Sequence, residues 1–67
     1  MRNRLKEFRK QRGISQEELA TKVEVTRQTI IAVEAGNYNP STLLSLKLAL
    51  HLRVKIEDLF QLDKSDN

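Results

Sequence analysis

The sequence contains no cysteine and only one histidine, His51. No disulfide can therefore stabilise the chain, no thiolate can hold a metal ion, and a lone imidazole cannot build a metal site. The sequence also has no glycine-rich phosphate loop and no nucleophile with a plausible base nearby in the sequence. We therefore expect a protein that is not an enzyme and that uses neither a metal nor a cofactor.

Long hydrophobic runs are also missing, since no segment approaches the roughly 20 apolar residues that span a bilayer. The first residues are charged and form no apolar signal segment. With 67 residues, we expect a single domain over residues 1–67, with a frayed tail at 63–67. The expected protein is cytoplasmic and has no membrane partner.

Charge is unevenly distributed along the chain, whose formal net charge is +3. The first dozen residues are strongly basic, and the last dozen are mainly acidic. The basic residues are Arg2, Arg4, Lys6, Arg9, Lys10 and Arg12. This asymmetry is compatible with a polyanionic partner on one side, but it is more typical of a solvated basic helix. Charge alone therefore does not identify a partner.

Helix formers dominate the sequence, and the alternation typical of strands is missing, which predicts an all-α fold. The expected helices cover about 2–12, 16–23, 27–35, a segment after residue 41, and 56–60. Gly13 and Gly36 are expected to end the first and third helices in the left-handed conformation. Ser15 and Glu18 form a capping box for the second helix, and Thr26 is a good N-cap for the third.

The fourth helix is unusually rich in leucine. Leu43, Leu46 and Leu50, together with Ala49, predict the stripe that packs on the core. Leu44 and Leu48 widen this stripe beyond what one small core needs. This surplus predicts a dimer, whose interface we place near the C-terminus, with a contribution from helix 4. The expected interface residues there are Val54, Lys55, Leu59 and Leu62.

The segment from Gln16 to Ala35 reads as two short helices joined by a turn. Leu19, Ala20 and Val23 form an apolar stripe on the first helix, and Ile30 and Val33 form one on the second. The small side chain of Ala20 lets the helices cross closely. This layout is typical of a helix-turn-helix that inserts its second helix into the major groove of DNA. Two ordinary amphipathic helices of a small bundle are the alternative.

The second of these helices opens with hydrogen-bonding side chains. Arg27 can bridge guanine O6 and N7, and Gln28 can bridge adenine N6 and N7. Ile31 and Ala32 share this face one turn later, where Ile31 can contact thymine methyl groups or be an ordinary surface residue. Other polar side chains are candidates for phosphate contacts, which set register rather than sequence preference. They are Gln16, Thr29, Asn37, Tyr38 and Asn39, with the basic residues of the first helix as weaker candidates.

Glu34 lies near the end of the third helix, where the helix dipole disfavours a carboxylate. It therefore needs a cation, and we expect Arg9 on the inner side of the first helix to form a partly buried ion pair with it.

The motifs SQEELA, TRQTI, Glu34-x-Gly36 and IEDLF resemble the phage repressor and Cro family (XRE family) of helix-turn-helix domains. The resemblance extends from about Leu5 to Phe60. It implies a five-helix, lambda-repressor-like fold in which the second and third helices form the helix-turn-helix, and binding to operators as homodimers. It also implies a phosphate-contacting Gln16 and an Arg9–Glu34 salt bridge. The DNA-facing positions that it implies are Thr26, Arg27, Gln28, Ile31 and Ala32.

The sequence departs from the family pattern at three positions. Glu24 stands where the turn between the two helices usually has glycine, so a positive φ there would cost roughly 1 kcal/mol. Lys55 replaces a serine-type cap of the fifth helix, which predicts fraying of that helix. Leu44 replaces an acidic residue that often completes a capping box with Ser41. None of these changes removes a DNA-facing residue.

These observations together predict a sequence-specific, double-stranded DNA-binding transcriptional regulator. We expect it to act as a homodimer on a palindromic operator, as a repressor. An acidic patch of Glu17, Glu18 and Glu24 could also contact RNA polymerase, although these carboxylates are also typical partners of a helix dipole. One alternative is an antitoxin-type autoregulator that also binds a partner toxin. Another is a protein-interaction module with a vestigial helix-turn-helix.

Overall fold

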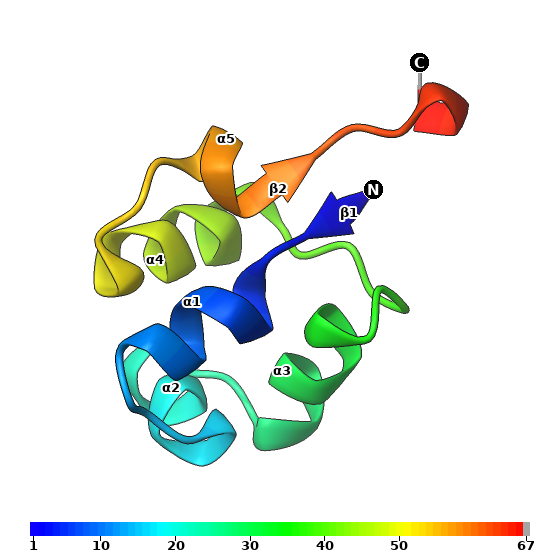
Figure 1. Cartoon of the computed structure of the whole chain (residues 1–67). Helices are drawn as coiled ribbons and strands as arrows, with labels where there is room; N and C mark the ends of the chain where they lie inside the picture. The colour runs from blue at the N-terminus through cyan, green and yellow to red at the C-terminus, as the bar shows by residue number, and fades with distance from the viewer. Residues whose placement is uncertain (67) are drawn as a thin grey trace.

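The computed structural model describes residues 1–66 and contains five helices and a small two-stranded sheet (Figure 1). The helices are α1 (Leu5–Gln11), α2 (Gln16–Lys22), α3 (Arg27–Glu34), α4 (Thr42–Leu52) and α5 (Ile56–Leu59). The strands are β1 (Arg2–Asn3) and β2 (Phe60–Gln61), and a short 3-10 helix, η1 (Lys64–Asp66), follows. The predicted five-helix fold class is confirmed. In this range, no helix combines the length and the apolar character that a membrane crossing requires.

Each of the five helices contributes at least one completely buried side chain to a single core. The buried side chains with no exposed surface are Leu5, Leu19, Ile30, Leu48, Leu52 and Leu59. Helices α2 and α3 pack closely on one another, and the buried Ala20 lies on the α2 side of this contact. In Figure 1, α1 lies between the α4–α5 pair and the α2–α3 pair. The helix-turn-helix is therefore held on a framework of the other three helices.

The predicted caps of α2 and α3 and the two helix-ending glycines are confirmed. Ser15 and Glu18 form the capping box, with the Ser15 hydroxyl 3.0 Å from the backbone nitrogen of Glu18. The hydroxyl groups of Thr26 and Ser41 cap α3 and α4. Gly13 and Gly36 have φ values of +67° and +79°. The side chain of Lys55 makes no capping hydrogen bond, and α5 is only four residues long.

The start of the chain differs from the prediction, because the first helix begins at Leu5 and residues 2–3 form a strand. In the antiparallel sheet, Arg2 pairs with Gln61 and Asn3 with Phe60. The Asn3 amide donates to the carbonyl oxygen of Val33 at 2.9 Å, and its Oδ1 accepts from the Leu5 backbone at 3.1 Å. Asn3 thus fixes an extended segment before the helix, through contacts with residues distant in sequence.

Helix α4 buries a different stripe from the one predicted. Leu44, Leu48 and Leu52 face the core, whereas Leu43, Leu46 and Leu50 are 65%, 53% and 73% exposed. Both stripes follow helical spacing, so periodicity could not choose between them. The choice is made by α5, which packs on α4 and whose Leu59 is fully buried.

Two residues other than glycine have a left-handed backbone. Glu24 in the turn between α2 and α3 has φ = 63°, which confirms the strained conformation considered for the missing glycine. Arg53, which ends α4, has φ = 56°, and the sequence analysis did not anticipate it. Each costs of the order of 1 kcal/mol relative to glycine in the same conformation.

The expected frayed tail differs from the structure over residues 63–66. Lys64–Asp66 form η1, and the Asp66 carboxylate lies 3.0 Å from the amino group of Met1. The guanidinium Nε of Arg2 lies 2.8 Å from an oxygen of Asp63. Charge pairing with the opposite end of the chain therefore orders this segment. Asn67, the last residue of the expected tail, lies outside the described residues.

Candidate nucleic-acid interface

Helix α3 presents one side to the core and the other to solvent. Ile30 and Val33 are buried against α2 and the framework, with exposed fractions of 0% and 1%. Arg27 and Gln28, in the first turn, are exposed, and no side-chain hydrogen bond within residues 1–66 engages either of them. A rigid helix therefore presents two unengaged hydrogen-bonding side chains at its N-terminal end.

The remaining residues of this outward side are more enclosed. Ile31 and Ala32 are half-buried, so their exposed atoms form a shallow apolar surface next to the polar tip. The Thr26 hydroxyl is occupied by the helix cap, accepting from the Thr29 backbone at 3.3 Å. It also lies 3.1 Å from the Thr29 hydroxyl. The first turn of α3 is thus fixed in position before any ligand arrives.

The loop after α3 continues the polar surface. Asn37, Tyr38 and Asn39 are all exposed, and Tyr38 is 47% exposed. The backbone N–H of Asn37 donates to the carbonyl oxygen of Ala32 at 3.0 Å, which ties the loop to the last turns of α3. The three side chains therefore lie next to α3 on a loop whose first residue is fixed.

Gln16 opens α2, and its side chain is oriented by Glu34. The amide nitrogen of Gln16 donates to Glu34 Oε1 at 3.1 Å. A primary amide has two hydrogens, so one donor of Gln16 remains for an external acceptor such as a phosphate oxygen. The sequence indicated Gln16 as a phosphate contact but gave no signal for this link to α3.

Glu34 is the centre of a buried polar network that joins three helices. Its two oxygens accept from Arg9 Nε at 2.6 Å and Arg9 Nη2 at 3.3 Å. The third guanidinium nitrogen of Arg9 donates to the Ile14 carbonyl oxygen at 2.9 Å. Only 10% of the Arg9 side chain and 5% of the Glu34 side chain are exposed. The structure therefore contains the ion pair that the sequence predicted, and the pair is almost completely buried.

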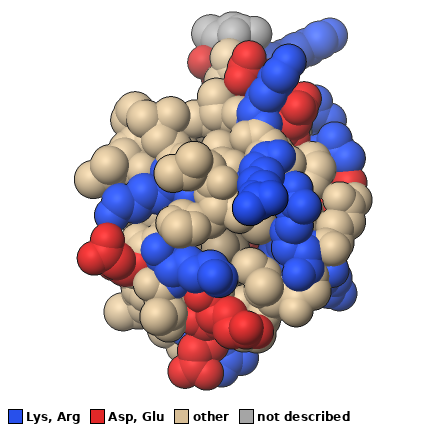
Figure 2. All heavy atoms as spheres, turned by 90° about the vertical axis from the view of Figure 1, so that its left-hand side faces the viewer, with Lys and Arg blue, Asp and Glu red and all other residues tan. Residues whose placement is uncertain are grey.

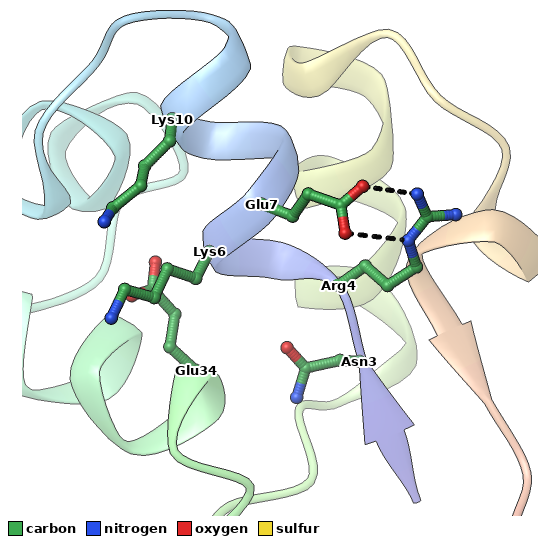
Figure 3. Close-up of a pocket in the computed structure, with 6 residues that line it drawn as sticks. All are labelled: Asn3, Arg4, Lys6, Glu7, Lys10 and Glu34. Carbon is green, nitrogen blue, oxygen red and sulfur yellow. Dashed lines mark hydrogen bonds and ion pairs between the residues drawn. The ribbon is translucent and has the colours of Figure 1, made fainter.

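A shallow cleft between α1 and α3 collects basic side chains (Figure 3). Figure 3 shows Lys6 and Lys10 on the same side of α1 as Glu34, whereas Arg4 and Glu7 extend together on the other side. The Glu7 carboxylate raises the pKa of Arg4 through a side-chain hydrogen bond, and Arg4 lowers the pKa of Glu7 in the same way. Glu7 thus offsets the charge of Arg4, so Lys6 and Lys10 carry the available positive charge of this cleft.

The charged side chains are unevenly spread over the surface. On the face shown in Figure 2, most Lys and Arg side chains lie in the centre and on the right, a group of Asp and Glu side chains lies at the bottom, and the upper left is largely uncharged. Within residues 1–66, no group of three potential ligands could hold a metal ion. The described surface therefore offers basic groups and apolar areas rather than a coordination site.

The expected acidic patch on α2 is mostly engaged within the chain. The carboxylate of Glu18 accepts from the Ser15 backbone at 3.0 Å, and this hydrogen bond lowers the pKa of Glu18. Glu24 Oε1 lies 3.2 Å from the ammonium group of Lys47. Of the three carboxylates, only Glu17 has no recorded partner among the described residues.

The expected C-terminal interface needs a correction. Leu59 has no exposed surface, so it cannot contact a second copy of the chain. It is buried because α5 closes the core over α4. Val54 is half-buried against the same core, whereas Lys55 is exposed and Leu62 is 65% exposed. The expected contribution of helix α4 also needs a correction, because the leucines taken as its surplus, Leu44 and Leu48, are buried, whereas Leu43, Leu46 and Leu50 are exposed.

Comparison with known proteins places this geometry in a known group. A family model described as "Helix-turn-helix" matches residues 5–59. An HTH-type transcriptional regulator of Methanothermobacter thermautotrophicus is 54% identical over 65 residues, covering 96% of this chain and 94% of the relative. One from Bacillus subtilis is 47% identical over 66 residues, covering 98% and 100%. The crystal structure of the restriction-modification controller protein C.AhdI from Aeromonas hydrophila matches with a TM-score of 0.79 and 40% identity, covering 85% of this chain and 86% of that one.

Proposed function

The chain belongs to the helix-turn-helix family of DNA-binding transcriptional regulators, and from this premise we propose that it binds a palindromic operator as a homodimer and represses transcription there. The observation that carries the proposal is the exposed polar tip of α3. Arg27 and Gln28 are exposed at the end of a helix whose other side is buried in the core. This is the end of a recognition helix that reaches base edges in the major groove.

In the proposed complex, base recognition comes from five residues of α3 and its cap. Arg27 bridges a guanine, and Gln28 bridges an adenine, each bidentate contact discriminating against a wrong base by about 1–3 kcal/mol. The half-buried Ile31 and Ala32 contact thymine methyl groups one turn further on. Thr26 lies at the edge of this set, because its hydroxyl already caps the helix.

Phosphate contacts fix the orientation of α3 in the groove. Gln16 uses its remaining amide hydrogen, and its position relative to α3 is set by Glu34. Thr29 and the loop after α3 supply the other phosphate contacts. The loop residues in question are Asn37, Tyr38 and Asn39. These contacts give affinity and register and carry no sequence information directly.

Dimerisation follows from the size of the recognition element. Helix α3 has eight residues, so it is only about 12 Å long and reads few base pairs. Two copies on half-sites about 34 Å apart double the base contacts. We infer repression because a dimer that occupies an operator blocks RNA polymerase from the DNA that it covers.

Selection of bound sequences from random duplexes tests the proposal directly. We expect an enriched site with two inverted half-sites one helical turn apart. Gln28→Ala should then weaken binding to that site roughly 5- to 150-fold, which corresponds to 1–3 kcal/mol, with little change on random DNA. Gln11→Ala is the matched control, because Gln11 is exposed on α1. Equal losses on the selected and random duplexes would contradict base recognition by Gln28.

A further inference from the structure

Helix α4 carries an exposed row of leucines that the fold does not use. Leu43, Leu46 and Leu50 are 65%, 53% and 73% exposed, although leucine is among the residues most often buried. Their spacing of three and four residues is that of the a and d positions of a coiled-coil heptad. We define these three residues as the leucine row. The opposite side of α4 is already packed in the core, so the leucine row is an additional apolar surface.

We propose that the leucine row is the surface through which two copies of this chain pair, with the two α4 helices parallel about a twofold axis. This inference rests on the proposed function, which already includes a homodimer, and it adds the surface and the orientation of the pairing. In this arrangement each leucine faces the same leucine of the second copy. Pairing through α4 replaces the C-terminal interface expected from the sequence, whose residue Leu59 is buried.

The charges around the leucine row favour a second copy as the occupant. Within Thr42–Leu52, the ionisable side chains are Lys47 and His51. The Lys47 ammonium is paired with the Glu24 carboxylate at 3.2 Å, so its charge is offset within each copy. Two chains of net charge +3 repel one another, but helix α4 itself adds no unpaired Lys, Arg, Asp or Glu to this face. A nucleic acid or an acidic protein would instead require exposed basic groups.

The parallel orientation follows from where the leucine row begins. Leu43 lines a shallow depression together with Thr29 of α3 and Tyr38 of the loop after it. Leu50 lies seven residues further along α4, about 10 Å away. Both α3 helices must face the same side of a DNA duplex, so the Leu43 ends of both copies must also lie on that side. An antiparallel pair would direct the two α3 helices to opposite sides.

Sedimentation equilibrium tests the surface with a matched pair of variants. Leu46→Glu places a charge in the middle of the leucine row, at a helical position that is 53% exposed, and circular dichroism checks that the variant is folded. It should raise the dimer dissociation constant about 100-fold or more, since the dimer carries the change twice. Leu62→Glu alters an equally accessible leucine outside α4 and should behave like the unaltered chain. A monomeric unaltered chain, an undisturbed Leu46→Glu dimer, or a dissociating Leu62→Glu dimer would each overturn the proposal.

Single cysteines test the orientation, because the chain has none of its own. Under mild oxidation, Leu43→Cys and Leu50→Cys should each cross-link with itself if the helices are parallel. Each disulfide requires Cβ atoms about 3.5–4.5 Å apart, so an antiparallel pair would cross-link only when the two variants are mixed. Cross-links that form only in the mixture would overturn the parallel arrangement.

Binding to a single half-site separates this proposal from the proposed function. Leu46→Glu should bind an isolated half-site as well as the unaltered chain does, and lose affinity only for the complete palindrome. A chain that binds the operator but shows no change with Leu46→Glu would refute the leucine row alone. A chain that dimerises through the leucine row but binds no selected duplex would refute the proposed function alone.

Discussion

Removing one partner of the Arg9–Glu34 pair should destabilise the protein far more than removing both. Glu34→Gln leaves the Arg9 guanidinium buried without a counter-charge, with only the Ile14 carbonyl and a neutral amide to accept from it. Since 10% and 5% of the two side chains are exposed, solvent screens the pair very little. Uncompensated buried charges of this kind cost about 3–5 kcal/mol.

This cost is large for a chain of 67 residues. At about 0.05–0.15 kcal/mol per residue, the whole domain is stable by roughly 3–10 kcal/mol. Each kcal/mol shifts the melting temperature of so small a domain by about 4–8 °C, so Glu34→Gln should lower it by at least ~12 °C. Arg9→Met should have a similar effect, because it leaves the Glu34 carboxylate buried with only Gln16 as a donor.

The double variant Arg9→Met, Glu34→Leu is the decisive measurement. It removes both charges and keeps a packed apolar contact, so its stability should lie within about 2 kcal/mol of the unaltered chain or exceed it. Urea unfolding of the unaltered chain, Arg9→Met, Glu34→Leu and the double variant, followed by far-ultraviolet circular dichroism, gives the coupling energy. Single variants that each lose less than ~1 kcal/mol, or a double variant whose loss equals the sum of the single losses, would refute this reasoning.

Three further changes have clear expected outcomes. Arg53→Gly should stabilise the fold by about 0.5–1 kcal/mol in urea unfolding. Glycine removes the strain of the left-handed backbone at this position, and this gain exceeds the added entropy of the unfolded chain. Arg53→Ala should give no such gain. Glu18→Gln should flatten the fall in the free energy of unfolding below pH 4.5. The backbone of Ser15 lowers the pKa of Glu18, so the ionised carboxylate stabilises the fold, and this stabilisation is lost as pH falls through the lowered pKa. An unchanged pH profile would contradict this role. Arg12→Met should lower the free energy of unfolding by about 0.5–1.5 kcal/mol, because it removes the 2.9 Å hydrogen bond from Nε to the Leu52 carbonyl oxygen. A change near zero would show that water replaces this hydrogen bond.

Local signals predicted most of the helices and the polar tip of the candidate interface. The capping box at Ser15, the cap at Thr26 and the glycines at 13 and 36 each act within one turn of the chain. The pairing of Arg9 with Glu34 could also be inferred, because a carboxylate at the end of a helix needs a cation. DNA contacts by α3 remain predictions, but Arg27 and Gln28 are exposed where the sequence indicated, and Ile31 and Ala32 are half-buried beside them.

Two features required information from distant parts of the chain. The strand at residues 2–3 exists because Asn3 reaches the carbonyl oxygen of Val33 and the strand pairs with residues 60–61. Gln16 is oriented by Glu34, eighteen residues away. No periodicity or local motif encodes such contacts, since they depend on how the helices pack.

By itself, the sequence determined where α2 and α3 lie and which residues stand at the start of α3, because caps, glycines and helical spacing act over a few residues. Only the tertiary structure decided which side of α4 is buried. Leu43 and Leu44 begin two apolar stripes of equal helical quality, and the packing of α5 selects the stripe of Leu44. The leucine row is exposed because burial is a property of the whole packed chain, whereas spacing is a property of each helix alone.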